Sequence, residues 1–257
     1  MILPLGDAPN PRGIAVMTWA LLLANIAVYI FVTFPLSFSP ADPSDPLLPE
    51  YTRVVSRALP EGVAPEEIAA HVSAYDLFVF RYGFRPAKPH LANLFYSLFL
   101  HAGFAHLFGN MLFLWIYGDN VESRLGPLWY VLAYLGTGVA ATLFHTIFDI
   151  DSGLPVVGAS GAISGVLGLY FWWFPQNRVR LLVFMFPWFM NTISVSARLV
   201  LGMFLIVDNV LPFLLTRGIQ SGGVAYGAHI GGFIAGLLLA MVMGRERTAE
   251  LLVEDGQ

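Results

Sequence analysis

Apolar residues along the chain gather into six long runs that are separated by more polar segments. The runs lie near residues 14–36, 98–118, 126–148, 157–174, 196–216 and 225–244. Each approaches the roughly 20 residues that an α-helix needs to cross the hydrocarbon core of a bilayer. The pattern therefore predicts an all-α polytopic membrane protein built from six transmembrane helices.

The same pattern predicts one membrane domain over residues 14–244. A short N-terminus (1–13) precedes it and a polar tail (245–257) follows it. A long first loop, at about 37–97, starts as a proline-rich linker and then favours a short surface helix within EGVAPEEIAAHVSAYD. Residues 178–195 are interrupted by Pro187 and Asn191, so we expect an interfacial or re-entrant segment there.

The composition fits this class and excludes several others. Hydrophobic residues make up 57% of the chain and charged residues 12%, with a mean hydropathy of +0.69. A soluble domain carries about twice that share of charge. Cysteine is absent, which excludes disulfides and thiolate chemistry. The net charge of −4 and the scattered basic residues argue against a nucleic-acid partner.

Basic residues near the spans predict the orientation. The N-terminus and the connections on its side carry Arg12, Arg124, Arg178, Arg180, Arg198, Arg245 and Arg247. The opposite short loops carry only Arg217, although the long first loop adds five basic residues. By the positive-inside rule we expect both termini in the cytoplasm. We also expect a multi-pass protein of a bacterial plasma (inner) membrane.

Polar residues interrupt the second, fourth and sixth runs near the ends that face outward. They are His106 and Asn110, then Ser160 and Ser164, then His229. At 1.5 Å per residue, Ser160 lies roughly 27 Å from Arg178, and His229 lies roughly 24 Å from Arg245. By the same rise, His106 lies roughly 20 Å from Asp119; these charged residues mark the inner ends of the three runs. Three helices therefore place polar groups at a similar depth below the outer surface.

Polar groups in a membrane are costly unless they pair, so these side chains should face the bundle interior. The stripes GAISG (161–165) and GFIAG (232–236) allow two helices to approach closely. If they face each other, Ser160 and His229 come within hydrogen-bond reach, and a nucleophilic serine needs such a base. The same residues also fit helix packing, and Ser164 is a second candidate, so the residues alone leave both interpretations open.

Other chemistries have less support in the sequence. The hydrolase elbow G-x-S-x-G is not matched because residue 162 is alanine, and no H-E-x-x-H occurs. Asp208 stands in the fifth run beside Asn209. It fits either a buried hydrogen-bonded residue or a pore or gate group.

Three segments together are highly specific. HAGFAHLFGN (101–110), GASG (158–161) and AHIGG (228–232) occur in an order that resembles the rhomboid intramembrane serine proteases, over residues 90–244. The resemblance implies that Ser160 is the nucleophile and His229 its general base. It implies that His106 and Asn110, with the backbone N–H of Ser160, stabilise the oxyanion.

The chain also departs from the family pattern. Some rhomboids carry an aromatic residue at the position of Ser164, stacked on the catalytic histidine, and here that ring is missing. The Glu122-x-Arg124 pair matches the turn after the second span, but the first-loop Trp–Arg element of some members is absent near Ala92 and Asn93. These departures leave the supports of His229 and Glu122 unassigned.

The resemblance implies an intramembrane serine endopeptidase that cleaves transmembrane protein substrates within membrane lipid, with no cofactor and no metal. The alternative is a catalytically silent rhomboid-like protein that binds client transmembrane helices. A small transporter that uses Asp208 and the buried histidines is a third hypothesis, which no inverted repeat supports.

Overall fold

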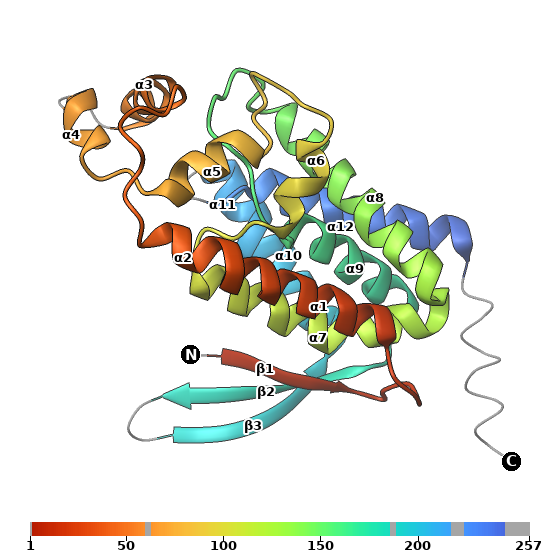
Figure 1. Cartoon of the computed structure of the whole chain (residues 1–257). Helices are drawn as coiled ribbons and strands as arrows, with labels where there is room; N and C mark the ends of the chain where they lie inside the picture. The colour runs from red at the N-terminus through yellow and green to blue at the C-terminus, as the bar shows by residue number, and fades with distance from the viewer. Residues whose placement is uncertain (1, 60–62, 186–188, 217–223, 245–257) are drawn as a thin grey trace, which may run out of the picture.

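The computed structural model describes residues 2–59, 63–185, 189–216 and 224–244 and forms a helical bundle with a small sheet at one end (Figure 1). Helices lie at all six positions that the apolar pattern predicts. They are α1 Val16–Val28 with η1 Tyr29–Thr33 and α2 Phe34–Ser37, α7 Phe104–Leu125, α8 Pro127–Thr146, α9 Ser160–Trp173, α10 Ala197–Leu205 with η3 Ile206–Val210 and α11 Leu211–Leu215, and α12 Tyr226–Met243. The predicted tail, 245–257, lies outside the described residues.

The number of membrane spans is not settled by helix length. Among the described residues, four helices are long and apolar enough to cross a bilayer: Val16–Ser37, Pro127–Thr146, Ala197–Leu215 and Tyr226–Met243. A fifth is counted if the pair Asn93–Phe99 and Phe104–Leu125, bent by 93°, forms one span. The predicted run 157–174 becomes the 14-residue helix α9, so six full spans are an expectation that helix length does not confirm.

Helix α9 is short because it begins inside the protein. Every residue from Gly161 to Tyr170 is buried, and α9 packs against α7, α8 and α12. The preceding Gly158 has a φ of +124°, a left-handed conformation that cannot continue a helix. The chain therefore enters the bundle in extended form and turns helical only at Ser160.

The two glycine stripes face each other across α9 and α12. A Cβ atom added at Gly232 would collide with the carbonyl oxygen of Gly161, and one added at Gly236 with that of Gly165. Glycine at these positions lets the two backbones touch. The predicted approach of the stripes is confirmed.

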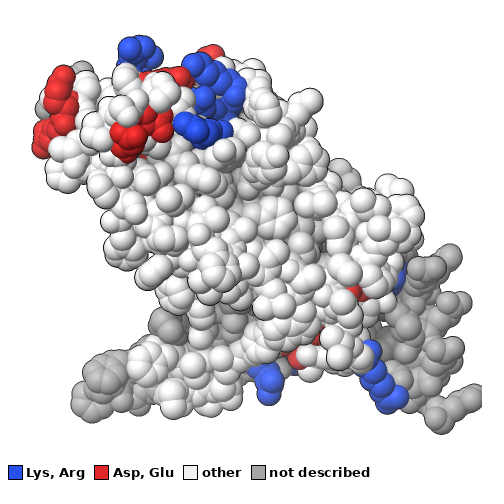
Figure 2. Space-filling view, in the orientation of Figure 1, with Lys and Arg blue, Asp and Glu red and all other residues white. Residues whose placement is uncertain are grey.

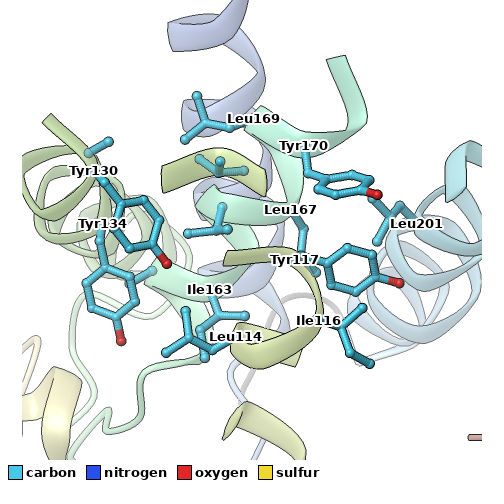
Figure 3. Close-up of a cluster of buried hydrophobic side chains, with 14 of the residues drawn as sticks. Leu114, Ile116, Tyr117, Tyr130, Tyr134, Ile163, Leu167, Leu169, Tyr170 and Leu201 are labelled. Atoms are coloured by element: carbon cyan, nitrogen blue, oxygen red, sulfur yellow. The ribbon is translucent and has the colours of Figure 1, made fainter. Parts of the chain in front are cut away.

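Large side chains fill the space around α9. Tyr117 of α7 and Tyr170 of α9 meet edge to face at 4.9 Å between ring centroids, while Tyr130 and Tyr134 of α8 lie on the other side of α9 (Figure 3). All four tyrosines are fully buried. The four rings belong to one hydrophobic core that α7, α8 and α9 share.

Glu122 of α7 binds the beginning of α1. Its carboxylate accepts hydrogen bonds from the backbone N–H groups of Met17 and Thr18, at 2.9 and 2.7 Å, and from the Thr18 hydroxyl at 2.8 Å. These are N–H groups that a helix cannot satisfy internally, and the helix dipole favours an anion at this end. The support of Glu122 that the sequence leaves unassigned is therefore the N-terminus of the first helix.

The structure adds a three-stranded antiparallel sheet to the predicted all-α class. Its strands are β1 Ile2–Ala8, β2 Arg178–Met185 and β3 Phe189–Ser196, in the order β1-β2-β3. In the described part of 178–195, β2 and β3 thus pair as antiparallel strands, so the re-entrant segment offered as one alternative is wrong. The alternation of exposed Arg178 and Arg180 with buried Val179 and Leu181 has the period of two that such a hairpin needs.

The long first loop holds more helix than the sequence predicts. It contains α3 Leu48–Ala58, α4 Pro65–Ala69, α5 Ala74–Tyr82, α6 Asn93–Tyr96 and the short η2 Ser97–Phe99. Helices α3 to α5 lie at the end of the bundle opposite the sheet (Figure 1). Charged side chains gather at these two ends, and the face between them is almost entirely uncharged (Figure 2).

Candidate active site

A cavity of about 460 Å³ opens in the bundle between α7, α9, α12 and the fifth helix, which is the continuous helix Ala197–Leu215 formed by α10, η3 and α11. Its wall includes all four residues that the sequence singles out: His106, Asn110, Ser160 and His229. It lies toward the end that carries the first-loop helices, because Ser97 and Val156 also line it. A second cavity of about 330 Å³ lies within the first loop, away from these four residues.

Ser160 is the first residue of α9, at the bottom of the extended segment. The N–H of Gly158 donates to the carbonyl of Ser97 at 2.8 Å, which fixes the approach of this segment. The first intrahelical bond here runs from Ile163 N–H to the carbonyl of Ala159, at 2.9 Å. The backbone N–H of Ser160 therefore belongs to the unpaired first turn of α9, where a helix binds negative charge.

His106 and Asn110 lie four residues apart on one face of α7. The Nδ2 donor of Asn110 is buried and has no hydrogen-bond partner among the described residues. The imidazole of His106 lies against Gly158 and also meets His101 edge to face, at 5.2 Å between ring centroids. His106 and Asn110 thus line the same cavity as Ser160, and Asn110 brings to it a buried donor that has no partner among the described residues.

His229 lies in the first turn of α12 and is held by two residues of the fifth helix. Its Nδ1 is 2.6 Å from Oδ1 of Asn209. The ring of Phe204 stacks on its imidazole, with 6.3 Å between centroids and 30° between planes. Phe204 and Asn209 therefore take the place of the aromatic residue that is missing at Ser164.

Sequence reasoning missed these two residues. Asn209 interrupts an apolar run just as Asp208 does, and that was a usable signal. The side chain of Asp208 is exposed and does not line the cavity, whereas Asn209 is only 1% exposed. Ser164 is buried one turn below Ser160 and also lines the cavity.

Ser160 and His229 share the cavity without a direct hydrogen bond. Within the described part of the chain, the Ser160 hydroxyl makes no side-chain hydrogen bond, and His229 bonds through Nδ1 to Asn209. Such bonds often tighten only when substrate binds. The described residues contain no group of three His, Asp or Glu side chains placed to hold a metal ion.

Known proteins resemble the part of the chain that holds this site. The Rhomboid domain family matches residues 88–246, which is more than half of the chain. Rhomboid protein 1, mitochondrial, of Saccharomyces cerevisiae is 31% identical over 151 residues, covering 55% of this chain and 39% of the yeast protein. Rhomboid protease GluP of Bacillus subtilis is 32% identical over 152 residues, covering 59% of this chain and 26% of GluP.

A plant relative shows the same partial coverage. RHOMBOID-like protein 1 of Arabidopsis thaliana is 32% identical over 155 residues, or 60% of this chain and 35% of the relative. The chain thus spans between about a quarter and two fifths of the length of these relatives. With its apolar helices and a family match that covers His106, Ser160 and His229, this integral membrane protein belongs to the rhomboid family.

Proposed function

We propose that this protein is an intramembrane serine endopeptidase that cleaves peptide bonds in or near the transmembrane segments of other membrane proteins. The observation that carries the proposal is that His106, Asn110, Ser160 and His229 line one cavity from three different helices. The sequence separates the first from the last by more than 120 residues. Four side chains suited to acyl transfer in one cavity support a catalytic role more strongly than any one of them does alone.

In the proposed mechanism the hydroxyl oxygen of Ser160 attacks the scissile carbonyl carbon while the imidazole of His229 takes the hydroxyl proton. The tetrahedral oxyanion accepts hydrogen bonds from Asn110 Nδ2, the His106 imidazole and the backbone N–H of Ser160. The C–N bond then breaks, and His229 gives its proton to the leaving amine. Water, deprotonated by His229, hydrolyses the acyl-enzyme and releases the new carboxyl end.

The unpaired donor of Asn110 supports the oxyanion part of this mechanism. A buried amide N–H without an acceptor costs about 1–3 kcal/mol. Several buried side-chain polar atoms of the described residues have no partner, and Asn110 Nδ2 is the one among them whose residue lines the cavity. The developing negative charge of the tetrahedral intermediate would satisfy it.

We propose that substrate enters from the lipid beside the fifth helix. Only 11% of the residues in the apolar window of Ala197–Leu215 are buried within the protein, against 44% for Tyr226–Met243. A helix packed so lightly can move at little cost in free energy. Because a substrate helix hides its carbonyl groups in hydrogen bonds, we expect cleavage near small or helix-breaking residues.

The orientation is proposed on the same basis. Arg12, Arg178 and Arg180 lie in or next to the sheet, which we therefore place in the cytoplasm together with the N-terminus. The cavity then opens toward the opposite side. Residues 14–244 act as one membrane domain in this proposal.

The test is cleavage of a single-span substrate by purified protein in liposomes, comparing wild type with Ser160→Ala and Ser164→Ala. We expect cleavage and fluorophosphonate labelling by wild type and Ser164→Ala, and neither by Ser160→Ala. Ser164→Ala is a matched control, because it removes a hydroxyl one turn deeper in the same cavity. A wild-type protein that binds single-span clients but neither cuts nor labels would support the client-binding alternative.

A further inference from the structure

The side chain of Asn209 ties the fifth helix to the proposed base. We propose that Asn209 is a positioning residue that fixes both the ring orientation and the tautomer of His229. This inference deepens the proposed function and rests on it. It assigns a role to a residue outside the three motifs that carry the family resemblance.

Two hydrogen bonds decide which way the amide of Asn209 points. Its Nδ2 donates to the backbone carbonyl of Phe204 at 2.7 Å, and its Oδ1 lies 2.6 Å from Nδ1 of His229. The reversed amide would set Oδ1 against the Phe204 carbonyl, which can only accept. The hydrogen-bond network therefore assigns the carbonyl end of the amide to the histidine.

An amide oxygen only accepts hydrogen bonds, so Nδ1 of His229 must carry the hydrogen. In a neutral imidazole the other nitrogen, Nε2, then holds the free lone pair. Nε2 is the atom that can take a proton from Ser160. Without an acceptor at Nδ1, the neutral ring can place its hydrogen on Nε2, which leaves no base facing the nucleophile.

The local backbone presents Asn209 to His229. Residues Ile206–Val210 form a π-helical turn, which often occurs at functional sites. The turn precedes Pro212, whose ring would clash with a carbonyl in a regular helix. Within it, Asp208 is exposed while its neighbour Asn209 is buried against α12. The side-chain amide of Asn209 donates to the backbone carbonyl of Phe204, which lies five residues earlier in the chain.

The bond also matches what the reaction requires of the base. His229 becomes positively charged when it takes the serine proton, and it is surrounded by apolar helices. An acceptor at Nδ1 stabilises that charge and holds the ring in place, which is the part that a carboxylate plays in a Ser-His-Asp triad. Here a neutral amide performs it, and Phe204 supports the ring from one face.

The first test compares Asn209→Leu, Asn209→Asp and Asp208→Asn in liposomes. Asn209→Leu keeps the approximate size and removes the acceptor. We expect kcat and the labelling rate of Ser160 to fall about 10- to 100-fold with KM unchanged, which is the range observed when a metal-binding histidine loses the hydrogen-bond partner that orients it. Asn209→Asp keeps an acceptor for His229 but loses the donor to the Phe204 carbonyl, so we expect a smaller loss of activity than in Asn209→Leu. Asp208→Asn, the matched exposed neighbour, should behave as wild type.

Two outcomes would overturn the inference. One is a wild-type kcat and labelling rate in Asn209→Leu. The other is an Asn209→Asp variant that is as stable as the wild type and yet loses as much activity as Asn209→Leu, which would mean that the acceptor is not what matters. Thermal unfolding of each variant separates a folding defect from a catalytic one. If Ser160→Ala still cuts, the proposed function fails, and this result is distinct from any result with Asn209.

A second measurement does not depend on activity. Nitrogen NMR of histidine-labelled protein, with the His229 signals assigned from their loss in His229→Gln, reads which ring nitrogen carries hydrogen. We expect hydrogen on Nδ1 in the wild type and a mixture of tautomers in Asn209→Leu. Hydrogen on Nε2 in the wild type would refute the inference, even in a protein that cleaves nothing.

Discussion

The backbone of Gly158 lies directly against the imidazole of His106. A Cβ atom at residue 158 would be 2.8 Å from Cε1 and 2.9 Å from Nε2 of His106, and 3.5 Å from Oγ of Ser160. The φ of Gly158 is +124°, which side chains of L-residues rarely adopt. Residue 158 therefore sets the distance between the proposed oxyanion site and the nucleophile.

We predict that Gly158→Ala abolishes fluorophosphonate labelling of Ser160, because the added methyl group must displace His106 or shift the start of α9. The matched control is Gly103→Ala, since Gly103 also precedes a helix of the site but has nothing within 4 Å of an added Cβ. Labelling at the wild-type rate in Gly158→Ala would contradict this account of the site. The measurement is the second-order labelling rate in detergent micelles.

Asn110→Leu should separate activity from stability. Removing an oxyanion donor typically lowers kcat about 100- to 1,000-fold, and we expect a loss in that range. The same change removes a buried donor that has no partner among the described residues, so the unfolding temperature should stay equal or rise. A variant that loses activity only because its unfolding temperature falls would argue that Asn110 serves packing.

Gly236→Ala should loosen the contact between α9 and α12. The new methyl group would collide with the backbone carbonyl of Gly165, and backbone cannot turn aside as a side chain does. Overpacking of this kind costs about 1–3 kcal/mol of unfolding free energy. Cleavage should fall with it, because α9 carries Ser160 and α12 carries His229.

Gly136→Ala provides the control for that substitution. Gly136 lies on the exposed side of α8, with nothing within 4 Å of an added Cβ, so we expect unfolding and cleavage as in the wild type. Equal unfolding temperatures for the two variants would show that the stripes do not need glycine. The comparison uses thermal unfolding in one detergent for all proteins.

Docking of strand β1 should weaken as the pH rises. Asp7 is buried beneath α7 and α9, where it accepts hydrogen bonds from Asn120 at 3.0 Å, from Asn177 at 3.4 Å and from the Tyr170 hydroxyl. Burial, with a smaller contribution from the nearby Asp119, raises the pKa of Asp7 to about 6 from a usual value of 3.8. The docked strand thus holds the Asp7 proton more tightly than the free strand does.

The sign follows from this difference in proton binding. Docking is strongest below the unfolded pKa, weakens as the pH rises through the window from about 4 to about 6, and is weakest above it. We expect the β1 backbone amides to be better protected from hydrogen exchange at pH 5 than at pH 7.5, after correction for intrinsic exchange rates. Asp7→Asn should remove this dependence; the same dependence in that variant would assign it to another group.

The sequence by itself indicated where the helices form and which residues are candidates for the chemistry. Apolar runs of membrane length produce helices because a helix satisfies the backbone hydrogen bonds of a single segment in lipid, and helices do lie at all six predicted positions. His106, Ser160 and His229 stand out because polar groups in such runs are costly. The length of an apolar run and the free-energy cost of a polar residue within it are local properties, so a single sequence reveals both.

Tertiary structure alone decided the partners that join distant segments. Strand β1 pairs with β2 across 170 residues or more, Glu122 binds the start of α1, and Asn209 reaches His229 from a neighbouring helix. A short apolar stretch such as 178–185 fits several structures until another strand lies beside it. Each of these contacts joins two separate elements, so it forms only once packing has placed them side by side. The contacts also supply hydrogen-bond partners for backbone N–H and C=O groups that would otherwise be unpaired.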